Sequence, residues 1–480
     1  MEDPSRSTLD ELHRFSWDVR NAPNRYHALM RTVIIGTGYV GLTTGVALAY
    51  VGRDVTCVDV NPEVVERLSR GEPTIHEPGL EELLHLAKDD LTFTGEIPPL
   101  EGDVVVVIAV GTPSKENGDA DMAYVDTAAK QIAAHIEPGA NVVIVNKSTV
   151  PIGSARHVDA IVRRTLSERG VEARVAVASN PEFLAEGRAV RDSLYPDRIV
   201  VGADDDYAIE TLRKLYRPLL EQAFEPPAGT PRPDRMPLPP FITTTATSAE
   251  LTKYAANSFL ATKISFINEF AGLAEKVGAD VTQVARAIGL DDRIGPRFLH
   301  AGIGWGGSCF GKDTRAILAT AAGYDYAMPL VQAAVNVNYQ QRVKIVEKLQ
   351  EHLKVLRGTT IGVLGLAFKG DTDDLRDAPA LTLVRELAER GAHVRAYDPI
   401  AMPAAEKLNP PLPATLTADA IDLARDCDAI VVATDWNEFR ALDLTAIKAA
   451  MRGEVVVDAR NWLDADDVRS HDLRYVGVGR

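Results

Sequence analysis

The chain has 480 residues, of which 46% are hydrophobic and 25% charged, a composition typical of proteins that fold around buried cores. The length exceeds one ordinary domain and predicts about two or three. The net charge of −16 argues against nucleic acid as a partner, because surfaces that bind nucleic acid are basic, and no stretch approaches the roughly 20 apolar residues of a membrane span.

Three cysteines, Cys57, Cys309 and Cys427, are scattered along the chain. Their odd number and wide separation favour a reducing cytoplasm over a disulfide framework, and no two stand at the spacing of zinc ligands. We therefore expect a cytoplasmic protein without a metal site. Residues 1–29 mix charged residues and proline without an apolar run, so they predict an accessory tail and not a secretory signal.

Residues 30–220 alternate between two kinds of pattern. Runs of β-branched and apolar residues predict strands at 32–35, 55–58, 104–110, 142–145 and 175–178. The segments between them have helical periodicity. Alternation of this kind predicts a doubly wound parallel sheet.

The first strand is followed by Gly36-x-Gly38-x-x-Gly41 at the start of a helix, and the second strand ends on Asp59. This is the context that the dinucleotide fingerprint requires, because the glycines let a pyrophosphate approach the helix N-terminus closely. Asp59 would accept hydrogen bonds from ribose hydroxyls and repel a 2′-phosphate. The segment therefore predicts NAD as the cofactor, with an ordinary glycine-rich turn as the alternative.

Polar segments follow two later strands, Lys147-Ser-Thr149-Val-Pro and Asn180-Pro-Glu182-Phe-Leu-Ala-Glu186. Ligands of α/β proteins bind at the carboxyl ends of strands. The hydroxyls of the first segment are expected near the nicotinamide. The carboxylates of the second could hold sugar hydroxyls, or could cap the next helix.

The middle of the chain changes character. Residues 221–247 are a predicted linker, with seven prolines between 221 and 240. Residues 248–356 are helical in pattern, and one helix of about thirty residues is expected to connect two lobes. In it Lys253 and Asn257 stand one turn apart on one face. Together they could stabilise an oxyanion, although a solvated lysine is an equally good interpretation.

Cys309 lies in the segment Gly304-Trp-Gly-Gly-Ser-Cys-Phe-Gly-Lys-Asp313. A helix beginning just after Gly311 would lower the thiol pKa through its dipole and through Lys312. Asp313 would lie on the same side and could position a water or act as a base. A lone cysteine is usually a small buried hydrophobe, but these flanking residues favour a nucleophile.

Residues 357–480 predict a second α/β unit, with strands at 361–365, 394–398, 429–433 and 455–458. The strand ending on Asp398 echoes the one ending on Asp59, although the full glycine fingerprint is absent here. The sequence therefore predicts an α/β chain of two Rossmann-like, doubly wound parallel-sheet domains, joined by a helical region with a long central helix.

Taken together, these segments resemble the UDP-glucose/GDP-mannose dehydrogenase family from about Arg31 to Asn461. The motifs occur in the family's order: Gly111-Thr-Pro113, Lys147–Pro151, Asn180–Gly187, Asp292–Gly295, Gly306–Phe310, Gly365–Lys369, Thr372–Arg376 and Asp458–Asn461. The resemblance implies an NAD-binding lobe, a long helix at a homodimer interface and a C-terminal lobe for the nucleotide. It also implies a four-electron oxidation of a nucleotide sugar in two steps, through a thiohemiacetal and a thioester on Cys309.

The resemblance further implies roles for single residues. Cys309 would be the nucleophile, and its catalytic partners would be Lys253, Asn257, Asp313, Thr149 and Glu182. The cofactor would contact Gly36, Gly38, Tyr39, Val40, Gly41, Asp59, Thr112, Ser148, Glu186, Lys312 and Arg376. The substrate would contact Glu182, Phe183, Leu184, Lys253, Asn257, Phe298, Gly306, Phe368, Lys369, Arg460 and, from the neighbouring subunit, Arg293.

UDP-glucose is the expected substrate, because Trp305, Phe310 and Pro196-Asp-Arg198 resemble the pattern of enzymes that act on it. GDP-mannose, with the same chemistry, is the alternative. The segment Asn180–Gly187 disfavours a UDP-N-acetylhexosamine. A reading from another class, a single-step 3-hydroxyacid dehydrogenase, would need neither Cys309 nor the C-terminal lobe.

Two positions depart from the family's pattern. Gly311 stands where relatives often have proline, which is expected to loosen the loop without removing a functional group. Val64 stands where relatives often have a basic residue near the ribose, so one expected cofactor contact is missing.

Overall fold

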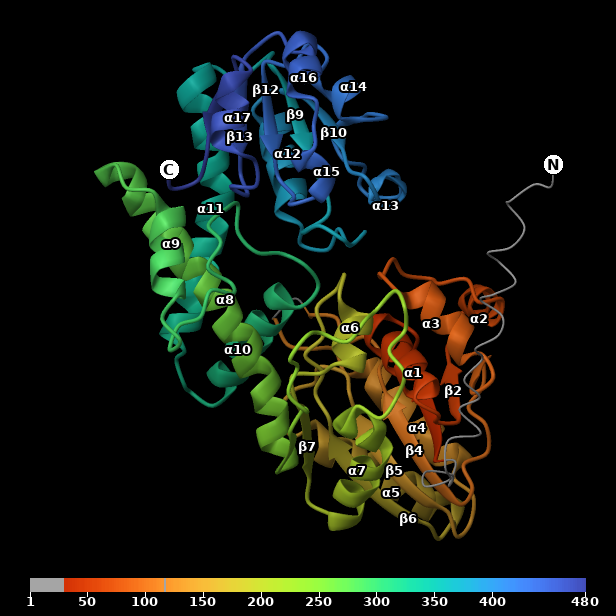
Figure 1. Ribbon diagram of the computed structural model, residues 1–480. Helices are drawn as coiled ribbons and strands as arrows, with labels where there is room; N and C mark the ends of the chain where they lie inside the picture. Colours follow the sequence, from red (N-terminus) through yellow and green to blue (C-terminus); the bar gives the residue numbers. More distant parts are fainter. Residues whose placement is uncertain (1–29, 116–117) are drawn as a thin grey trace, which may run out of the picture.

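The computed structural model describes residues 30–115 and 118–480, so the predicted tail at 1–29 lies outside the described residues. Two α/β lobes lie one above the other in Figure 1, the N-terminal lobe in red to yellow and the C-terminal lobe in blue. Long helices coloured green to teal run along one side of both. The predicted fold class, with two parallel-sheet domains and a long helix between them, is confirmed.

The N-terminal lobe is built on one sheet in the order β3-β2-β1-β4-β5-β6-β7-β8. Its strands are β1 (Arg31–Ile35), β2 (Val55–Val58), β3 (Leu91–Thr94), β4 (Asp103–Ile108), β5 (Asn141–Asn146), β6 (Arg174–Ser179), β7 (Ile199–Ala203) and β8 (Phe241–Thr244). Neighbouring strands are parallel except β6 and β7, which are antiparallel. β8 comes from the proline-rich segment 221–247 that the sequence predicts as a linker.

Helices cover both faces of this sheet because its central strands are apolar on both sides. In β5, Val143 and Val145 face a core with one set of helices, and Val142 and Ile144 face a core with the other. The first set is α1 (Tyr39–Tyr50), α2 (Pro62–Ser69), α3 (Leu80–Ala87), α6 (Ala189–Leu194) and α7 (Asp206–Glu221). The second set is α4 (Ala123–His135) and α5 (Ser154–Arg169).

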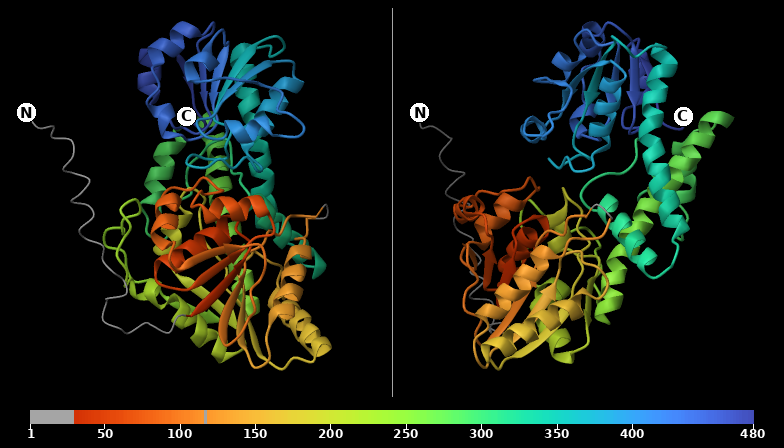
Figure 2. Two further views of the ribbon diagram at one scale, coloured as in Figure 1. Left: turned by 90° about the vertical axis from the view of Figure 1, so that its right-hand side faces the viewer. Right: turned by 180° about the vertical axis from the view of Figure 1, so that it is seen from behind.

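The predicted long helix is α8 (Ala246–Val277), which has 32 residues. Thr245 caps its start by accepting from the Ser248 N–H at 3.1 Å, and Gly278 ends it with a left-handed φ of 73°. It packs against the helices that follow it, α9 (Val281–Gly289), α10 (Phe310–Gly323) and α11 (Pro329–Leu353). Figure 2 shows from behind that α8 and α11 run from the first lobe to the second.

The C-terminal lobe is a six-stranded parallel sheet in the order β11-β10-β9-β12-β13-β14. Its strands are β9 (Thr360–Leu364), β10 (His393–Tyr397), β11 (Thr415–Leu416), β12 (Ala429–Val432), β13 (Val455–Asp458) and β14 (Arg474–Val476). Its helices are α12 (Pro379–Glu389), α13 (Met402–Glu406), α14 (Ala420–Ala424), α15 (Asn437–Arg440), α16 (Leu444–Ala450) and α17 (Ala465–Ser470). The strand order repeats that of the first six strands of the N-terminal sheet.

The repetition extends to the turn after the first strand of each sheet. Gly36 and Gly365 both have left-handed backbones, with φ of 96° and 93°. Asp59 Oδ2 accepts from the Thr37 N–H at 3.0 Å, and Asp398 Oδ2 accepts from Leu366 N and Ala367 N. Asp398 is fully buried. In the second lobe the aspartate therefore occupies two backbone donors of the turn, whereas Asp59 occupies one.

None of the helices in the described part of the chain is long and apolar enough to cross a membrane.

Candidate active site

The glycine turn between β1 and α1, residues 36–41, has the geometry of an anion-binding site. We call it the cofactor turn. A Cβ at Gly41 would collide with the carbonyl oxygen of Gly36, so only glycine allows this approach. At Gly38, the residue before α1, a Cβ would meet nothing within 4 Å. No side chain caps α1 and its first turn holds no acidic residue, which leaves backbone N–H groups and the positive helix end free. This turn fits the pyrophosphate of NAD.

Lys253 and Glu182 form a buried ion pair beyond the turn. Lys253 projects from α8, and its Nζ lies 2.6 Å from Glu182 Oε1. Glu182 Oε2 accepts from the Leu184 N–H at 2.6 Å. Burial opposes ionisation of Glu182, but Lys253 and this hydrogen bond outweigh it, and the pKa of Glu182 is lowered. Burial acts on Lys253 in the same sense, yet Glu182 raises the pKa of Lys253, so both groups are charged.

A second buried chain of contacts joins α8 to α10 and the strand ends. Asn257, one turn after Lys253, donates from Nδ2 to Asp313 Oδ2 at 2.6 Å. Lys312 Nζ lies 2.8 Å from Asp313 Oδ1 and 3.5 Å from Thr112 Oγ1. Thr112 Oγ1 in turn donates to the backbone carbonyl of Thr149 at 2.7 Å. The structure thus brings these five predicted residues together.

Cys309 is the residue before α10, which begins at Phe310, slightly earlier than the helix start expected after Gly311. The sequence predicts a lowered thiol pKa, and this prediction is wrong in direction. Burial raises the pKa of Cys309, Lys253 lowers it in part, and the carboxylates of Glu182 and Asp313 raise it further. The ionised form of the thiol is therefore disfavoured at this position.

Glu186 links the loop before α10, residues 304–309, to the C-terminal lobe. We call this segment the cysteine loop. Ser308 Oγ donates to Glu186 Oε1 at 2.8 Å and lies 3.4 Å from the Cys309 sulfur. Arg376 Nη2 lies 3.4 Å from the same Glu186 oxygen and donates to Asp374 Oδ2 at 2.7 Å. Burial, together with the neighbouring Asp374, raises the pKa of Glu186 to about 8.

Residues predicted to hold the nucleotide sugar meet on the C-terminal side of the same loop. Arg460 donates to the carbonyls of Gly304 at 3.1 Å and Phe368 at 2.6 Å. Lys369 Nζ lies 5.5 Å from the centre of the Phe368 ring, and Gly306 lies against the backbone of Asp377. In this structure Arg460 ties the cysteine loop to the Phe368 segment.

Two aromatic residues of the predicted site lie beside it, and one arginine does not. The Phe298 ring packs edge-on to Phe310, with centroids 6.3 Å apart. The Phe183 ring lies beneath Lys253 Nζ at 5.7 Å. Arg293 is exposed and pairs with Asp291 at 2.6 Å, away from this cluster.

Two further charged residues near this site, Glu250 and Lys147, are buried, and the sequence motifs predicted a role for neither. Glu250 on α8 caps α5, because its carboxylate accepts from Gly153 N at 2.6 Å and from Ala155 N at 2.8 Å. Its spacing of three residues from Lys253 was the available signal. Lys147 donates to Asn180 Oδ1 at 3.0 Å, and burial lowers its pKa to about 8. Ser148, which was predicted to contact the cofactor, donates to the Val110 carbonyl at 2.7 Å.

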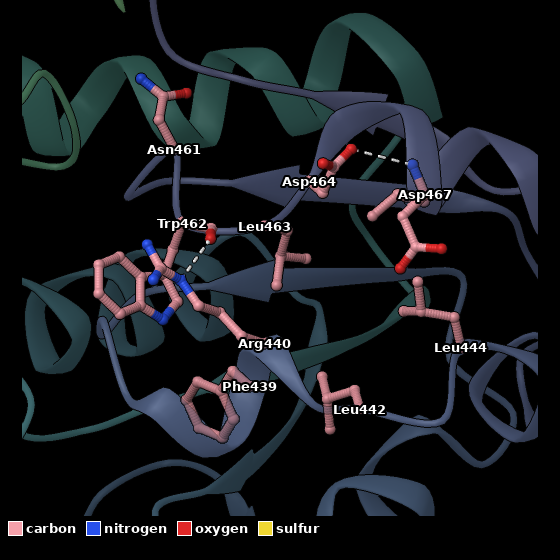
Figure 3. Close-up of a pocket in the computed structure, with 10 residues that line it drawn as sticks. Phe439, Arg440, Leu442, Leu444, Asn461, Trp462, Leu463, Asp464 and Asp467 are labelled. Carbon is pink, nitrogen blue, oxygen red and sulfur yellow. Dashed lines mark hydrogen bonds between the residues drawn. The ribbon is translucent and has the colours of Figure 1, made fainter.

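A separate hollow of about 370 Å³ lies in the C-terminal lobe. Figure 3 shows it between the α15 region and the segment after β13. The Arg440 guanidinium stacks over the Trp462 ring, 3.5 Å from its centre, and donates to the Trp462 carbonyl. None of its lining residues belongs to the predicted site. Nor do the described residues include a group of three or more side chains arranged to hold a metal ion.

Three family models match the chain in succession. They describe the NAD binding domain, the central domain and the UDP binding domain of the UDP-glucose/GDP-mannose dehydrogenase family, and they match residues 30–220, 247–340 and 362–465.

Similar proteins span nearly the whole chain. A UDP-glucose 6-dehydrogenase of Rhizobium meliloti (strain 1021) is 45% identical over 94% of this chain and 100% of its own length. UDP-glucose 6-dehydrogenase TuaD of Bacillus subtilis (strain 168) is 41% identical over 94% of each chain. A solved UDP-glucose dehydrogenase from Pyrobaculum islandicum is 37% identical, with a TM-score of 0.81, over 95% of this chain and 99% of its own.

Proposed function

The chain belongs to the UDP-glucose/GDP-mannose dehydrogenase family and has its NAD-binding domain, and from that premise we propose that it oxidises the C6 hydroxymethyl group of UDP-glucose to a carboxylate. Cys309 is the covalent nucleophile. The observation that carries the proposal is the placement of this cysteine at the start of α10, beside the Lys253–Glu182 and Asn257–Asp313 pairs. The full-length similarity to proteins named UDP-glucose 6-dehydrogenase supports UDP-glucose as the substrate.

Bound NAD⁺ supplies the acceptor for two electrons in each of two oxidations. After the first, the Cys309 sulfur bonds to the carbon of the C6 aldehyde, the thiol proton passes to a base, and the former carbonyl oxygen takes up a proton, giving a thiohemiacetal. The second oxidation leaves a thioester. Water then attacks the thioester carbon, the C–S bond breaks, and the carboxylate and the free thiol are released. Covalent capture retains the aldehyde between the two oxidations.

The charged pairs suit the oxyanions and the water of this sequence. Lys253 and Asn257 stabilise negative charge on the sugar oxygen, since a buried ammonium and a fixed amide act strongly at low dielectric. Asp313, held by Asn257 and Lys312, orders the hydrolytic water. Glu182 and Thr149 assist proton transfer and place that water. Glu186, Ser148, Lys312, Thr112 and Arg376 are assigned to the cofactor side.

The C-terminal lobe, with Phe298, Phe368, Lys369 and Arg460, is assigned to the UDP moiety. The domain limits at 220, 247 and 356 remain predictions.

We further assign α8 to a homodimer interface, because one face exposes the large apolar side chains Phe259, Phe266, Phe270, Leu273 and Val277. In that dimer the exposed Arg293 would reach the neighbouring subunit's nucleotide.

The test is the NADH yield per nucleotide sugar, with UDP-glucose and GDP-mannose offered separately to the purified protein. Two NADH per UDP-glucose, with little from GDP-mannose, is the expected result. A preference for GDP-mannose would overturn the substrate and keep the chemistry. One NADH per sugar, with accumulation of the aldehyde, would remove the covalent role of Cys309.

A further inference from the structure

Tyr39, the residue after the second glycine of the cofactor turn, reaches into the other lobe. Its hydroxyl donates to Asp373 Oδ1 at 3.2 Å and lies 3.3 Å from Thr372 Oγ1. Within its own lobe the hydroxyl lies 3.4 Å from the His76 carbonyl oxygen. The Thr372 side chain is fully buried, and those of Tyr39 and Asp373 are half-buried. Tyr39 stands at the free N-terminus of α1, where a pyrophosphate is expected. The contact therefore joins the cofactor turn directly to the C-terminal lobe.

The segment 371–377 that receives Tyr39 also contacts the rest of the site. We call it the strap. The Arg376 carbonyl accepts from the Gly307 N–H of the cysteine loop at 3.0 Å, and the Arg376 guanidinium reaches Glu186. A Cβ at Gly187 would come within 2.7 Å of the Asp371 carbonyl oxygen, so the backbones are in close approach. The strap thus contacts three parts of the site: the cofactor turn, the segment around Glu186, and the cysteine loop.

The proposed reaction places an unusual demand on this arrangement. Two equivalents of NAD⁺ act on one sugar that stays bound to Cys309. The reduced cofactor must therefore leave, and a second oxidised one must enter, while the sugar is still covalently held. A contact between the cofactor turn and the lobe that holds the sugar opposes this exchange for as long as it stays closed.

We propose that the contact of Tyr39 with Asp373 and Thr372 is a closure contact that controls cofactor exchange between the two oxidations. Tyr39 is a positioning residue in this role, acting through the strap. The proposal rests on the proposed function, because only a two-step oxidation on one enzyme requires exchange at this stage. A hydrogen bond to a carboxylate is worth a change of about tenfold or more in a rate or equilibrium.

The experiment is the dissociation rate of NADH from the purified full-length protein, followed by its fluorescence after rapid mixing with excess NAD⁺. Tyr39→Phe removes the hydroxyl and keeps the ring, and Asp373→Ala removes the acceptor from the opposite lobe. Tyr50→Phe is the matched control, because Tyr50 lies at the other end of α1 and donates to the Glu225 carbonyl within the same lobe at 2.6 Å.

Both lobe-bridging variants are expected to release NADH about tenfold faster or more, with Tyr50→Phe unchanged. The double variant is expected to match Tyr39→Phe, because removal of the hydroxyl already removes the bond to Asp373. An effect of Tyr39→Phe without one of Asp373→Ala would mean that the bond to Asp373 between the lobes does not control NADH release, and would overturn the proposal. So would unchanged rates in both. The readout needs only NADH, so failure to oxidise UDP-glucose would be a separate result.

Discussion

Lys253 Nζ and Glu182 Oε1 lie 2.6 Å apart in a site where both side chains are more than nine-tenths buried. The Lys253 ammonium is therefore already paired with a carboxylate of the protein. Lys147, which is also buried, adds positive charge that favours the ionised form of Glu182. In the proposed mechanism, this second buried cation would compensate Glu182 when Lys253 acts on a substrate oxyanion.

Breaking this pair is expected to cost both stability and activity. Lys253→Met leaves a buried carboxylate without its main counter-charge, so the free energy of unfolding should fall by about 3 kcal/mol and kcat by at least about a hundredfold. Adding Glu182→Gln should restore much of the stability, measured by urea unfolding, but not the activity. Lys276→Met, on the exposed end of the same helix, should change neither. An unaltered unfolding midpoint in Lys253→Met would contradict this account.

The alkylation of Cys309 by iodoacetamide should depend on pH in a defined direction. Because burial raises the thiol pKa, the reactive thiolate should be scarce at neutral pH, and the rate should rise as the pH passes above the usual thiol range. Lys253→Met should move the profile to higher pH, and Asp313→Asn should move it to lower pH. Peptide mass spectrometry resolves Cys309 from the buried Cys57 and Cys427. Shifts in the same direction for both variants would refute the assigned causes.

Gly38 and Gly41 of the cofactor turn should respond differently to substitution by alanine. Gly41→Ala forces a Cβ onto the Gly36 carbonyl, so α1 cannot keep its place, and thermal unfolding should occur at a markedly lower temperature. Gly38→Ala meets no protein atom and should fold normally, yet bind NADH more weakly, because its methyl group occupies the space above the helix N-terminus. Circular dichroism and NADH titration separate the two effects. Equal NADH affinity in Gly38→Ala and wild type would place the pyrophosphate elsewhere.

Glu77 should make stability depend on pH. Its buried carboxylate accepts from Gly187 N and Ala189 N, and burial raises its pKa from 4.5 to about 7. The folded chain then binds more protons than the unfolded chain between these values, so its contribution to stability declines as the pH rises from about 4.5 to about 7.

The measurement for Glu77 is the unfolding free energy of wild type minus that of Glu77→Gln, at several pH values. This difference should fall across that window and then level off. Glu81→Gln, at an exposed position nearby, should give a flat difference. A difference for Glu77 that rises with pH would show that the carboxylate is stabilised in its ionised form.

Most of the fold could be predicted from sequence, because strands buried on both faces appear as continuous apolar runs. Of the strands that were not predicted, β3 and β8 lie at the sheet edges and are partly exposed, and β11 and β14 have two and three residues. β7 was also not predicted, although it is fully buried. β8 was further masked by the prolines that precede it. The antiparallel pairing of β6 with β7 has no local signal.

The motifs predicted the candidate site residues, but not which of them contact one another or how their surroundings shift their pKa values. Glu182 meets Lys253, 71 positions away, and Tyr39 meets Thr372, 333 positions away, so these contacts exist only in the folded chain. The thiol pKa of Cys309 was predicted in the wrong direction for the same reason. A helix start and a nearby lysine are visible in sequence, whereas the burial that outweighs them is not.

The most direct test of the central claim is the rate at which Cys309→Ala converts UDP-glucose to UDP-glucuronate. Without the sulfur no thioester can form, so acid release should fall by at least about a thousandfold, while binding of NADH is retained. Acid released at the wild-type rate would contradict the covalent mechanism, and would assign the oxidation of the aldehyde to a hydrate that never bonds to the protein.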